Sequence, residues 1–119
     1  MIFVFGSNLR GAHGGGAAYE AAQNFGAEYG VGVGPTGRSY AIPTKDEKIQ
    51  TMPLEDIRPH VDAFIEYARR NPDKQFFVTA IGCGLAGYEP KDIAPMFRGA
   101  PFNCTLHRRL VDYLHGEGA

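Results

Sequence analysis

Two glycine-rich segments each follow an apolar run and precede residues at helical spacing. The first contains Gly14-Gly15-Gly16, and the second runs from Gly82 to Gly87. Glycine lets the backbone approach a ligand closely, and the free N–H groups at a helix start attract negative charge. Both segments therefore suit a phosphate or pyrophosphate; tight turns that serve helix–sheet packing are the alternative. The first segment is neither a dinucleotide fingerprint, because Tyr19 stands where glycine is needed, nor a Walker A loop.

Three polar side chains lie close to these segments or at a strand end. Asn8 follows the first apolar run, and we expect it either to hydrogen-bond a sugar hydroxyl or to bond its own backbone in a turn. Lys45 can attack a carbonyl or acetal carbon if its pKa is lowered; otherwise it pairs with phosphate or faces solvent. His13 is a candidate general acid or ligand contact, with an exposed loop histidine as the commoner alternative.

The remaining candidates carry weaker patterns. Cys83 has no identifiable histidine partner, which favours a small buried residue over a nucleophile. Tyr88 is expected either to stack on a base or ribose or to be a partly buried loop aromatic. Arg10 and Arg38 can contact phosphate, with solvated charge as the default. Cys83 and Cys104 are too few for a disulfide framework and lack metal-ligand spacing with a histidine, so we expect reduced thiols and no metal site.

Length and composition favour one globular domain over residues 1–119. The chain has 119 residues, 44% hydrophobic and 21% charged, with a formal net charge of -1. This composition supports a core and does not favour disorder. With no basic block, strong nonspecific capture of a nucleic-acid backbone is not expected. The apolar runs are too short to cross a bilayer and Met1 leads into no charged segment or cleavage site, so a cytoplasmic protein is expected.

Short apolar runs alternate with helical patterns along the chain. The first strand is expected over 2–5, stopped by Gly6-Ser7-Asn8, and the glycine-rich segment 29–38 is expected to have no regular structure. The most regular helix pattern places Ile57, Val61, Phe64 and Ala68 on one face. The other expected elements are a helix over 18–25, strands over 39–44, 76–81 and 102–106, a helix over 90–97, and a short helix or tail over 109–115.

This alternation predicts an α/β fold with a small, mostly parallel sheet between helical layers. In such a sheet the loops after the carboxyl ends of the strands gather on one edge, where ligands bind. The loops 6–16, 44–51 and 82–88 should therefore converge on one site.

The order of these motifs resembles the macro domain, an ADP-ribose-binding three-layer α/β/α fold, over nearly the whole chain. The motifs that carry the resemblance are the strand ending at Asn8, the helix opening at Gly14–Ala18, and the Thr79–Tyr88 segment. Tyr40–Lys45 and Ile81–Leu85 are most similar to the branch that contains terminal ADP-ribose protein glycohydrolase and the antitoxins that reverse DNA ADP-ribosylation. The Gly-Ser-Asn-Leu opening is also similar to small proteins of phages and bacteria.

The resemblance implies a protein that binds ADP-ribose or a related NAD-derived nucleotide and removes it from a modified protein or nucleic acid. Asn8 would meet the distal ribose, and Lys45 would attack its anomeric carbon and release the modified group. No cofactor or metal is implied. The two glycine loops, Gly14–Gly16 and Gly82–Leu85, would wrap the pyrophosphate. Together with the candidates taken from the residue pattern, the expected ligand contacts are Asn8, His13, Gly14, Gly15, Gly16, Thr44, Gly82, Cys83, Gly84, Leu85 and Tyr88.

Two differences from that branch leave alternatives open. The branch has an acidic residue where this chain has Ala86, so an acid–base partner would come from Asp46, Glu47, His13 or Glu89, or from none of them. The chain also begins at the strand leading into Asn8, without the acidic residue that holds adenine in macro domains, so another nucleotide is possible. A non-catalytic module that reads or sequesters ADP-ribose is the main alternative function, and a scaffold whose glycines are merely structural is the third.

Overall fold

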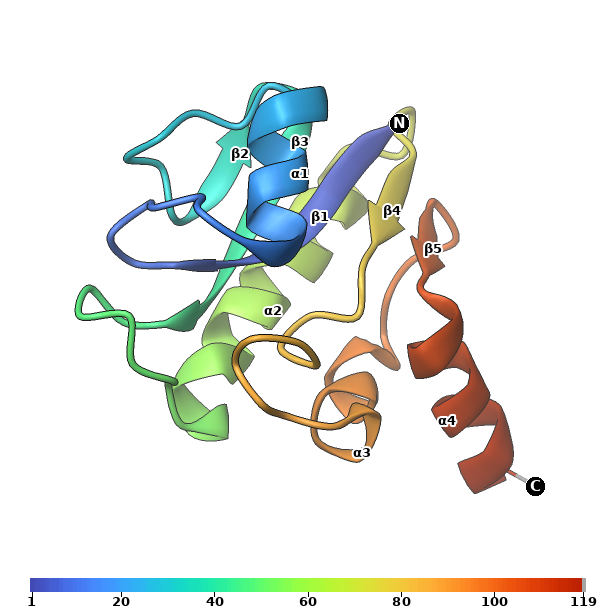
Figure 1. Ribbon diagram of the computed structural model, residues 1–119. Coiled ribbons are helices and arrows are strands. Elements are labelled where there is room, and N and C mark those ends of the chain that lie inside the picture. The colour runs from blue at the N-terminus through green and yellow to red at the C-terminus, as the bar shows by residue number, and fades with distance from the viewer. Residues whose placement is uncertain (119) are drawn as a thin grey trace.

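Strands and helices alternate along residues 1–118, which the computed structural model describes (Figure 1). The elements in chain order are β1 (Ile2–Asn8), α1 (Gly16–Asn24), β2 (Gly34–Thr36), β3 (Ser39–Lys45), α2 (Leu54–Arg70), β4 (Phe76–Val78), α3 (Pro90–Ile93), the 3-10 helix η1 (Ala94–Phe97), β5 (Cys104–Leu106) and α4 (Arg108–Gly118). No helix among these residues is long and apolar enough to cross a membrane.

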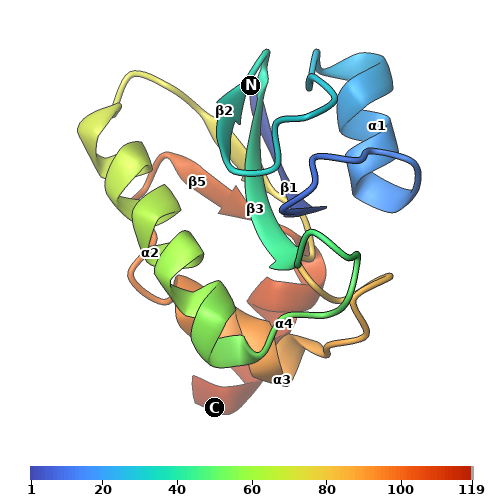
Figure 2. The ribbon, with the colours of Figure 1, turned by 90° about the vertical axis from the view of Figure 1, so that its left-hand side faces the viewer.

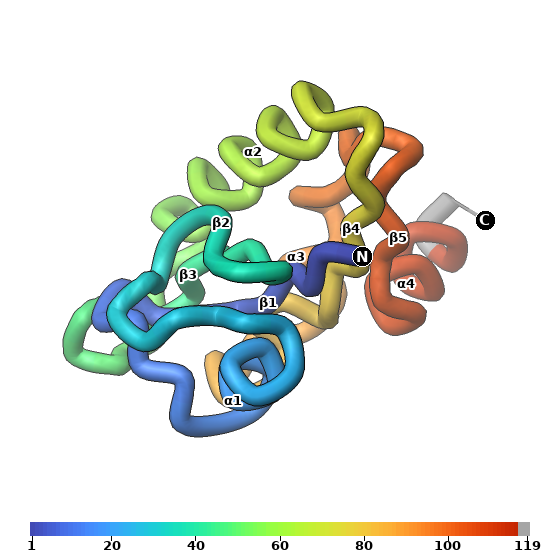
Figure 3. Tube along the Cα trace, turned by 90° about the horizontal axis from the view of Figure 1, so that it is seen from above, coloured from blue at the N-terminus to red at the C-terminus, as the bar shows by residue number. Residues whose placement is uncertain are grey.

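The strands form one mixed sheet in the order β2-β3-β1-β4-β5. The pairs β1–β3, β1–β4 and β4–β5 are parallel, and β2 runs antiparallel to β3 at one edge. Seen from above, α1 covers one face of the sheet and α2 the other (Figure 3), and Figure 2 shows α2 running across the sheet face with α3 and α4 near its lower end. The predicted α/β fold with a mostly parallel sheet between helical layers is confirmed.

Alternate residues of β1 pack on opposite faces of the sheet, as the period of a strand requires. Phe3 and Phe5 pack with the alanines of α1 in one apolar cluster, whereas Val4 belongs to the larger cluster under α2. The predicted apolar face of α2 is confirmed, because all four of its residues are buried in this larger cluster: Ile57, Val61, Phe64 and Ala68.

Several boundary predictions were wrong, among them the strand expected over 102–106, which begins at Cys104, and three have identifiable reasons. The first strand does not stop at Gly6, because parallel pairing with β3 extends it to Asn8. The segment 29–38 does contain a short strand, since Gly34–Thr36 pairs with β3 although glycine and proline are poor strand formers. The strand expected over 76–81 ends at Val78, after which the chain turns and Gly82 adopts a φ of 72° that favours glycine.

The loop after β1 is held by close backbone packing at Gly32. A Cβ atom added there would overlap the carbonyl oxygen of Asn8, and the same carbonyl accepts a hydrogen bond from the N–H of Gly11 at 3.0 Å. Any side chain at Gly32 must therefore displace the end of β1, which is the strand end nearest the predicted site.

We predict that Gly32→Ala lowers the free energy of unfolding by about 1–3 kcal/mol, because the added methyl group cannot be accommodated without moving backbone. Urea unfolding measures the change. The matched control is Gly99→Ala, where an added Cβ meets nothing within 4 Å and no positive φ is required, so its midpoint should stay near wild type. Equal midpoints for the two variants would contradict this packing.

Candidate functional site

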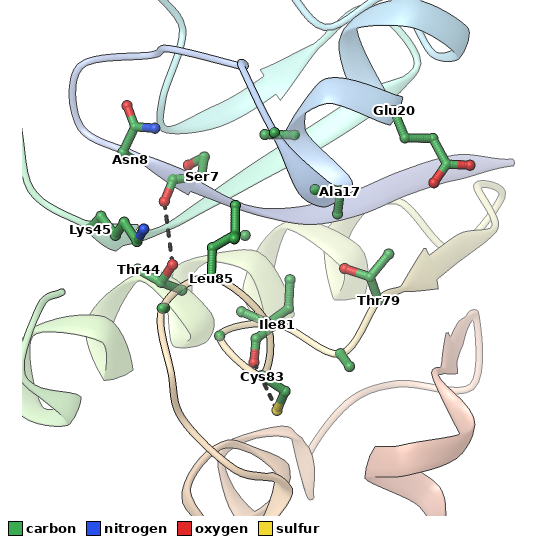
Figure 4. A pocket seen from close by; sticks show the side chains of 18 of the residues that line it. Ser7, Asn8, Ala17, Glu20, Thr44, Lys45, Thr79, Ile81, Cys83 and Leu85 are labelled. Atoms are coloured by element: carbon green, nitrogen blue, oxygen red, sulfur yellow. Dashed lines mark hydrogen bonds between the residues drawn. The ribbon is translucent and has the colours of Figure 1, made fainter. Parts of the chain in front are cut away.

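A cavity of about 1090 Å³ opens at the carboxyl ends of β1, β3 and β4. It continues along the face of the sheet that carries α1, so it is bounded both by loops and by strand side chains. Figure 4 shows the labelled side chains around it. The predicted site residues that line it are Asn8, Gly14, Gly15, Gly16, Thr44, Lys45, Gly82, Cys83, Gly84 and Leu85.

Asn8 uses its side-chain amide to fix the loop that follows β1. Its Nδ2 donates to the carbonyl of Ala12 at 2.8 Å, and its Oδ1 accepts from the N–H of Ala12 at 3.0 Å. Of the two roles considered for Asn8, the structure therefore shows the turn role, in which the side chain bonds nearby backbone. Each group retains capacity for one further hydrogen bond, because an amide carries two donor hydrogens and its oxygen two lone pairs.

Lys45 lies beside Asn8 because their strands pair in parallel. A register shift between Ser7 and Asn8 sets Asn8 opposite Lys45, and the N–H of Leu9 donates to the Lys45 carbonyl at 2.9 Å. The Lys45 side chain is half-buried and reaches into the cavity, with Asn8 above it in Figure 4. The buried Thr44 lines the same wall, where its hydroxyl donates to the carbonyl of Ser7 at 3.4 Å.

The first glycine segment forms the start of α1. Gly15 is the N-cap residue and makes no side-chain cap bond, so the first N–H groups of the helix are left for solvent or a ligand. Gly16 has a φ of 58°, a conformation that side chains rarely adopt. Glycine carries no side chain of its own, so this segment can present backbone donors to an anion at short range, and the Leu85 Cδ1 is the side-chain atom that lies nearest to Gly15 and Gly16.

The second glycine segment lies across the cavity from the first. The carbonyl of Gly82 accepts from the N–H of Tyr88 at 2.8 Å, and the N–H of Cys83 donates to Ala80 at 3.0 Å, which closes the loop. Leu85 projects from this loop with 72% of its surface exposed. A Cβ added at Gly15 would lie 3.3 Å from the Leu85 Cδ1, so the two glycine segments meet at this point.

The ionisable side chains around the cavity give it a positive balance. Arg10, Lys45 and Arg109 line it, and among the described lining residues Glu20 supplies the one carboxylate. Arg10 is held by a bond from its Nε to the carbonyl of Glu47 at 2.9 Å. Arg109 reaches the carbonyl of Cys83 at 3.4 Å, so it lies against the second glycine loop. This charge distribution favours an anionic ligand.

Two predicted contacts do not lie at the cavity. His13 is fully buried and packs edge-on against Phe5, with ring centroids 5.5 Å apart. Its Nε2 lies 2.9 Å from the backbone carbonyl oxygen of Glu28 and hydrogen-bonds to it. Its other ring nitrogen, Nδ1, is buried without a hydrogen-bond partner among the described residues. Tyr88 donates its hydroxyl hydrogen to the carbonyl of Met52 at 2.5 Å and packs against the core under α2. His13 is thus neither the exposed loop histidine nor a cavity residue.

The four candidates for an acid–base partner also lie outside the lining. Asp46 accepts from the N–H groups of Lys48 and Gln50 and so holds the turn after β3. Glu89 belongs to the capping box of α3, and Glu47 and His13 do not line the cavity either. No carboxylate of the described chain therefore lines the end of the cavity that holds Lys45, since Glu20 lies at the opposite end (Figure 4).

Several lining residues were not predicted. Glu20 lies on α1, Phe77 and Thr79 lie on and just after β4, and His107 and Arg109 lie at the start of α4. The strand period could have placed Phe77 on the face of Phe3, but the position of α4 beside that face depends on tertiary packing. These residues extend the cavity beyond the two glycine loops.

A scan against protein-family models, a search of curated proteins and a search of solved structures each found no match to this chain. The fold and the site therefore have to be interpreted from the geometry of the chain itself.

Both cysteines are in environments that oppose ionisation. Burial raises the pKa of the Cys83 thiol, and this outweighs the neighbouring Arg109, whose charge lowers that pKa. Burial raises the pKa of Cys104 to about 11. A thiol with a raised pKa is mostly protonated near neutral pH and is a poor nucleophile. Cys83 is nevertheless only half-buried and lines the cavity, so it is not the fully buried small residue that the sequence favoured.

We predict slow alkylation of both cysteines by iodoacetamide at pH 8. The shift of the Cys104 pKa from 9.0 to about 11 reduces its thiolate by about a hundredfold, because each pKa unit changes the ionised fraction about tenfold. Mass spectrometry of the native protein and of the urea-unfolded chain measures the two rates. Labelling of native Cys83 as fast as in the unfolded chain would contradict a protonated, partly buried thiol.

Proposed function

We propose that this protein binds ADP-ribose or a related NAD-derived nucleotide in the cavity, with the diphosphate between the two glycine segments. The observation that carries the proposal is the meeting of two glycine loops, at Gly15 and Leu85, in a cavity whose lining cations outnumber its carboxylates. Backbone donors and fixed positive charge together favour a diphosphate over a neutral ligand.

The dimensions of the cavity agree with a ligand larger than a single phosphate. Its volume of about 1090 Å³ lies just above the range of ordinary small-molecule sites, which is about 300–1,000 Å³. Leu85 of the second glycine loop lies between the Lys45 end and the Glu20 end (Figure 4), so a diphosphate bound at the loops would have a group on each side. A dinucleotide-like ligand has that form, and the similarity of the motifs to macro domains supports the same assignment.

Removal of ADP-ribose from a macromolecule is the second candidate function. It is favoured by the Lys45 amine, which faces the cavity beside Asn8, where the resemblance places the distal ribose. In that reaction the neutral Lys45 amine would form a bond to the anomeric carbon while the bond to the modified group breaks, and the proton that the amine loses would pass to the leaving group. Water would then hydrolyse the lysine adduct, which releases ADP-ribose and restores the amine. Ala86 supplies no proton, and no lining carboxylate lies at that end, so the site supports binding more fully than turnover.

Binding is tested by a thermal shift with ADP-ribose, NAD, AMP and inorganic pyrophosphate in parallel. A ligand at a hundred times its Kd adds about 2.7 kcal/mol of stability, which raises the Tm of a domain of this size by several degrees. We expect the largest shift with ADP-ribose and a smaller one with AMP, which has only one phosphate. The absence of a shift with all four compounds would overturn the proposed function.

Lys45 is tested by two substitutions and a control. Lys45→Arg keeps the positive charge, so the affinity for ADP-ribose should stay within a few-fold, whereas Lys45→Met should weaken it by about tenfold. Lys48→Met is the control, because Lys48 is exposed and does not line the cavity. Titration calorimetry measures the affinities, and equal affinities for Lys45→Met and Lys48→Met would show that Lys45 does not contact the ligand.

The same Lys45→Arg variant separates the two functions. If the wild-type protein releases ADP-ribose from a modified substrate, the variant should lose that activity, because guanidinium is not an amine nucleophile. Turnover at the wild-type rate by Lys45→Arg would show that the nucleophile is assigned wrongly. Binding without release by the wild-type protein would establish the non-catalytic reader.

A further inference from the structure

We infer that the cavity takes a nucleotide with an additional phosphate group on its nucleoside sugar, and that Arg109 and His107 bind that phosphate. This inference rests on the proposed function, because it adds a phosphate to a ligand whose diphosphate lies between the glycine segments. The chemical class is a nucleotide phosphorylated at the 2′ or 3′ oxygen of the nucleoside sugar. A nucleotide derived from NADP carries this group at the 2′ oxygen.

Arg109 has no carboxylate partner that would account for its charge. It lines the cavity and forms no ion pair among the described residues. Its Nη1 donates to the Cys83 carbonyl at 3.4 Å, which is a long hydrogen bond, and a guanidinium has further donors to spare. The neighbouring Arg108 differs, because it pairs with Asp112 at 3.6 Å and does not line the cavity. The charge of Arg109 is therefore available to a ligand.

The guanidinium of Arg109 lies at the second glycine loop, on the side away from Lys45. It bonds the Cys83 carbonyl, and its charge also lowers the pKa of the Cys83 thiol, although burial outweighs this effect. Figure 4 separates Cys83 from Asn8 across the cavity. With the diphosphate at the glycine loops and the Lys45 end on one side of it, Arg109 is left beside the nucleoside half of the ligand.

His107 supplies a second donor between Arg109 and the sheet. Its half-buried ring lines the cavity, with its centroid 6.4 Å from that of Phe77. The His107 Nδ1 accepts from the backbone N–H of Arg109 at 3.0 Å, so in the neutral ring the proton is on Nε2 and that nitrogen is a donor. Together the two side chains offer an imidazole N–H and a guanidinium, the group that binds phosphate through two parallel hydrogen bonds.

No carboxylate of the described residues neutralises this part of the lining. Glu20, the one lining carboxylate among them, belongs to α1 and lies across the cavity from Cys83 (Figure 4). Glu89 and Asp92 act on the Cys83 thiol from outside the lining, where they form the capping box of α3. In dinucleotide sites, an arginine near the nucleoside sugar accommodates a 2′-phosphate, whereas a carboxylate there bonds the free hydroxyl. Arg109 corresponds to the first arrangement.

The test compares ligands that differ by one phosphate group. Titration calorimetry measures the affinity of the wild-type protein for ADP-ribose and ADP-ribose 2′-phosphate, and for AMP and the 2′,5′- and 3′,5′-bisphosphates of adenosine. We expect the extra phosphate to raise the affinity about tenfold, as one hydrogen-bonded contact between charged groups does. The bisphosphate with the larger gain identifies the sugar oxygen that carries the phosphate.

Two substitutions and a control assign the gain to Arg109. Arg109→Met should reduce the gain to within about twofold and leave the affinities for ADP-ribose and pyrophosphate unchanged, whereas Arg109→Lys should retain part of it, because it keeps the charge without the planar fork. Arg108→Met is the matched control, since Arg108 is exposed and does not line the cavity, and it should keep the full gain. Urea midpoints near wild type are expected for all of them, because both arginines are exposed.

Equal wild-type affinities with and without the extra phosphate, or an unchanged gain in Arg109→Met, would overturn the phosphate site at Arg109 and leave the diphosphate site intact. A loss of pyrophosphate affinity in Arg109→Met as large as its loss for ADP-ribose 2′-phosphate would also overturn it, because Arg109 would then belong to the diphosphate site. Failure of ADP-ribose, the bisphosphates and pyrophosphate to bind the wild-type protein would overturn the proposed function and this inference together.

Discussion

The hydrogen bonds between the Asn8 side chain and the backbone of Ala12 are the interaction on which the site depends. These hydrogen bonds fix the turn that follows β1, and the turn thereby positions the glycine segment where α1 begins. The same residue is paired in register with Lys45, so the position of the lysine amine follows from the same strand end. The Gly32 backbone packs so closely on the Asn8 carbonyl oxygen that a Cβ atom would not fit between them, and this contact restricts the loop after β1.

The cavity that results has two chemically different ends joined by the glycine loops. One end, with Lys45 and Arg10, is cationic and polar; the other has an aromatic floor at Phe77 with Glu20 beside it. The loops between them expose backbone donors and meet where Leu85 lies over Gly15. The ligand that we propose, a nucleotide of the ADP-ribose class, has a polar group, a diphosphate and a flat base in sequence, so it would reach both ends of the cavity.

The sequence was informative where local physics decides the outcome. The helix α2 was predicted from its regular apolar spacing, and β3 was predicted as a short strand that follows a glycine-rich segment. It was uninformative where tertiary packing decides, as for the edge strand β2, whose glycine and proline pair with β3 despite poor strand propensity. His13 illustrates the same limit, since nothing local shows that a loop histidine is buried against Phe5. Glu20 was not predicted to line the cavity, because its position there depends on which face α1 turns toward the cavity.

The most direct test of the central claim is the mapping of amide chemical-shift changes in the ¹⁵N-labelled protein during titration with ADP-ribose. The account predicts that the largest changes occur together at Gly14–Ala17 and at Gly82–Ala86, with smaller changes near Phe77 and Glu20 where the base would lie. Changes confined to one glycine segment, or centred on the distant face of α2 around Arg58 and Arg69, would contradict a ligand held between the two loops.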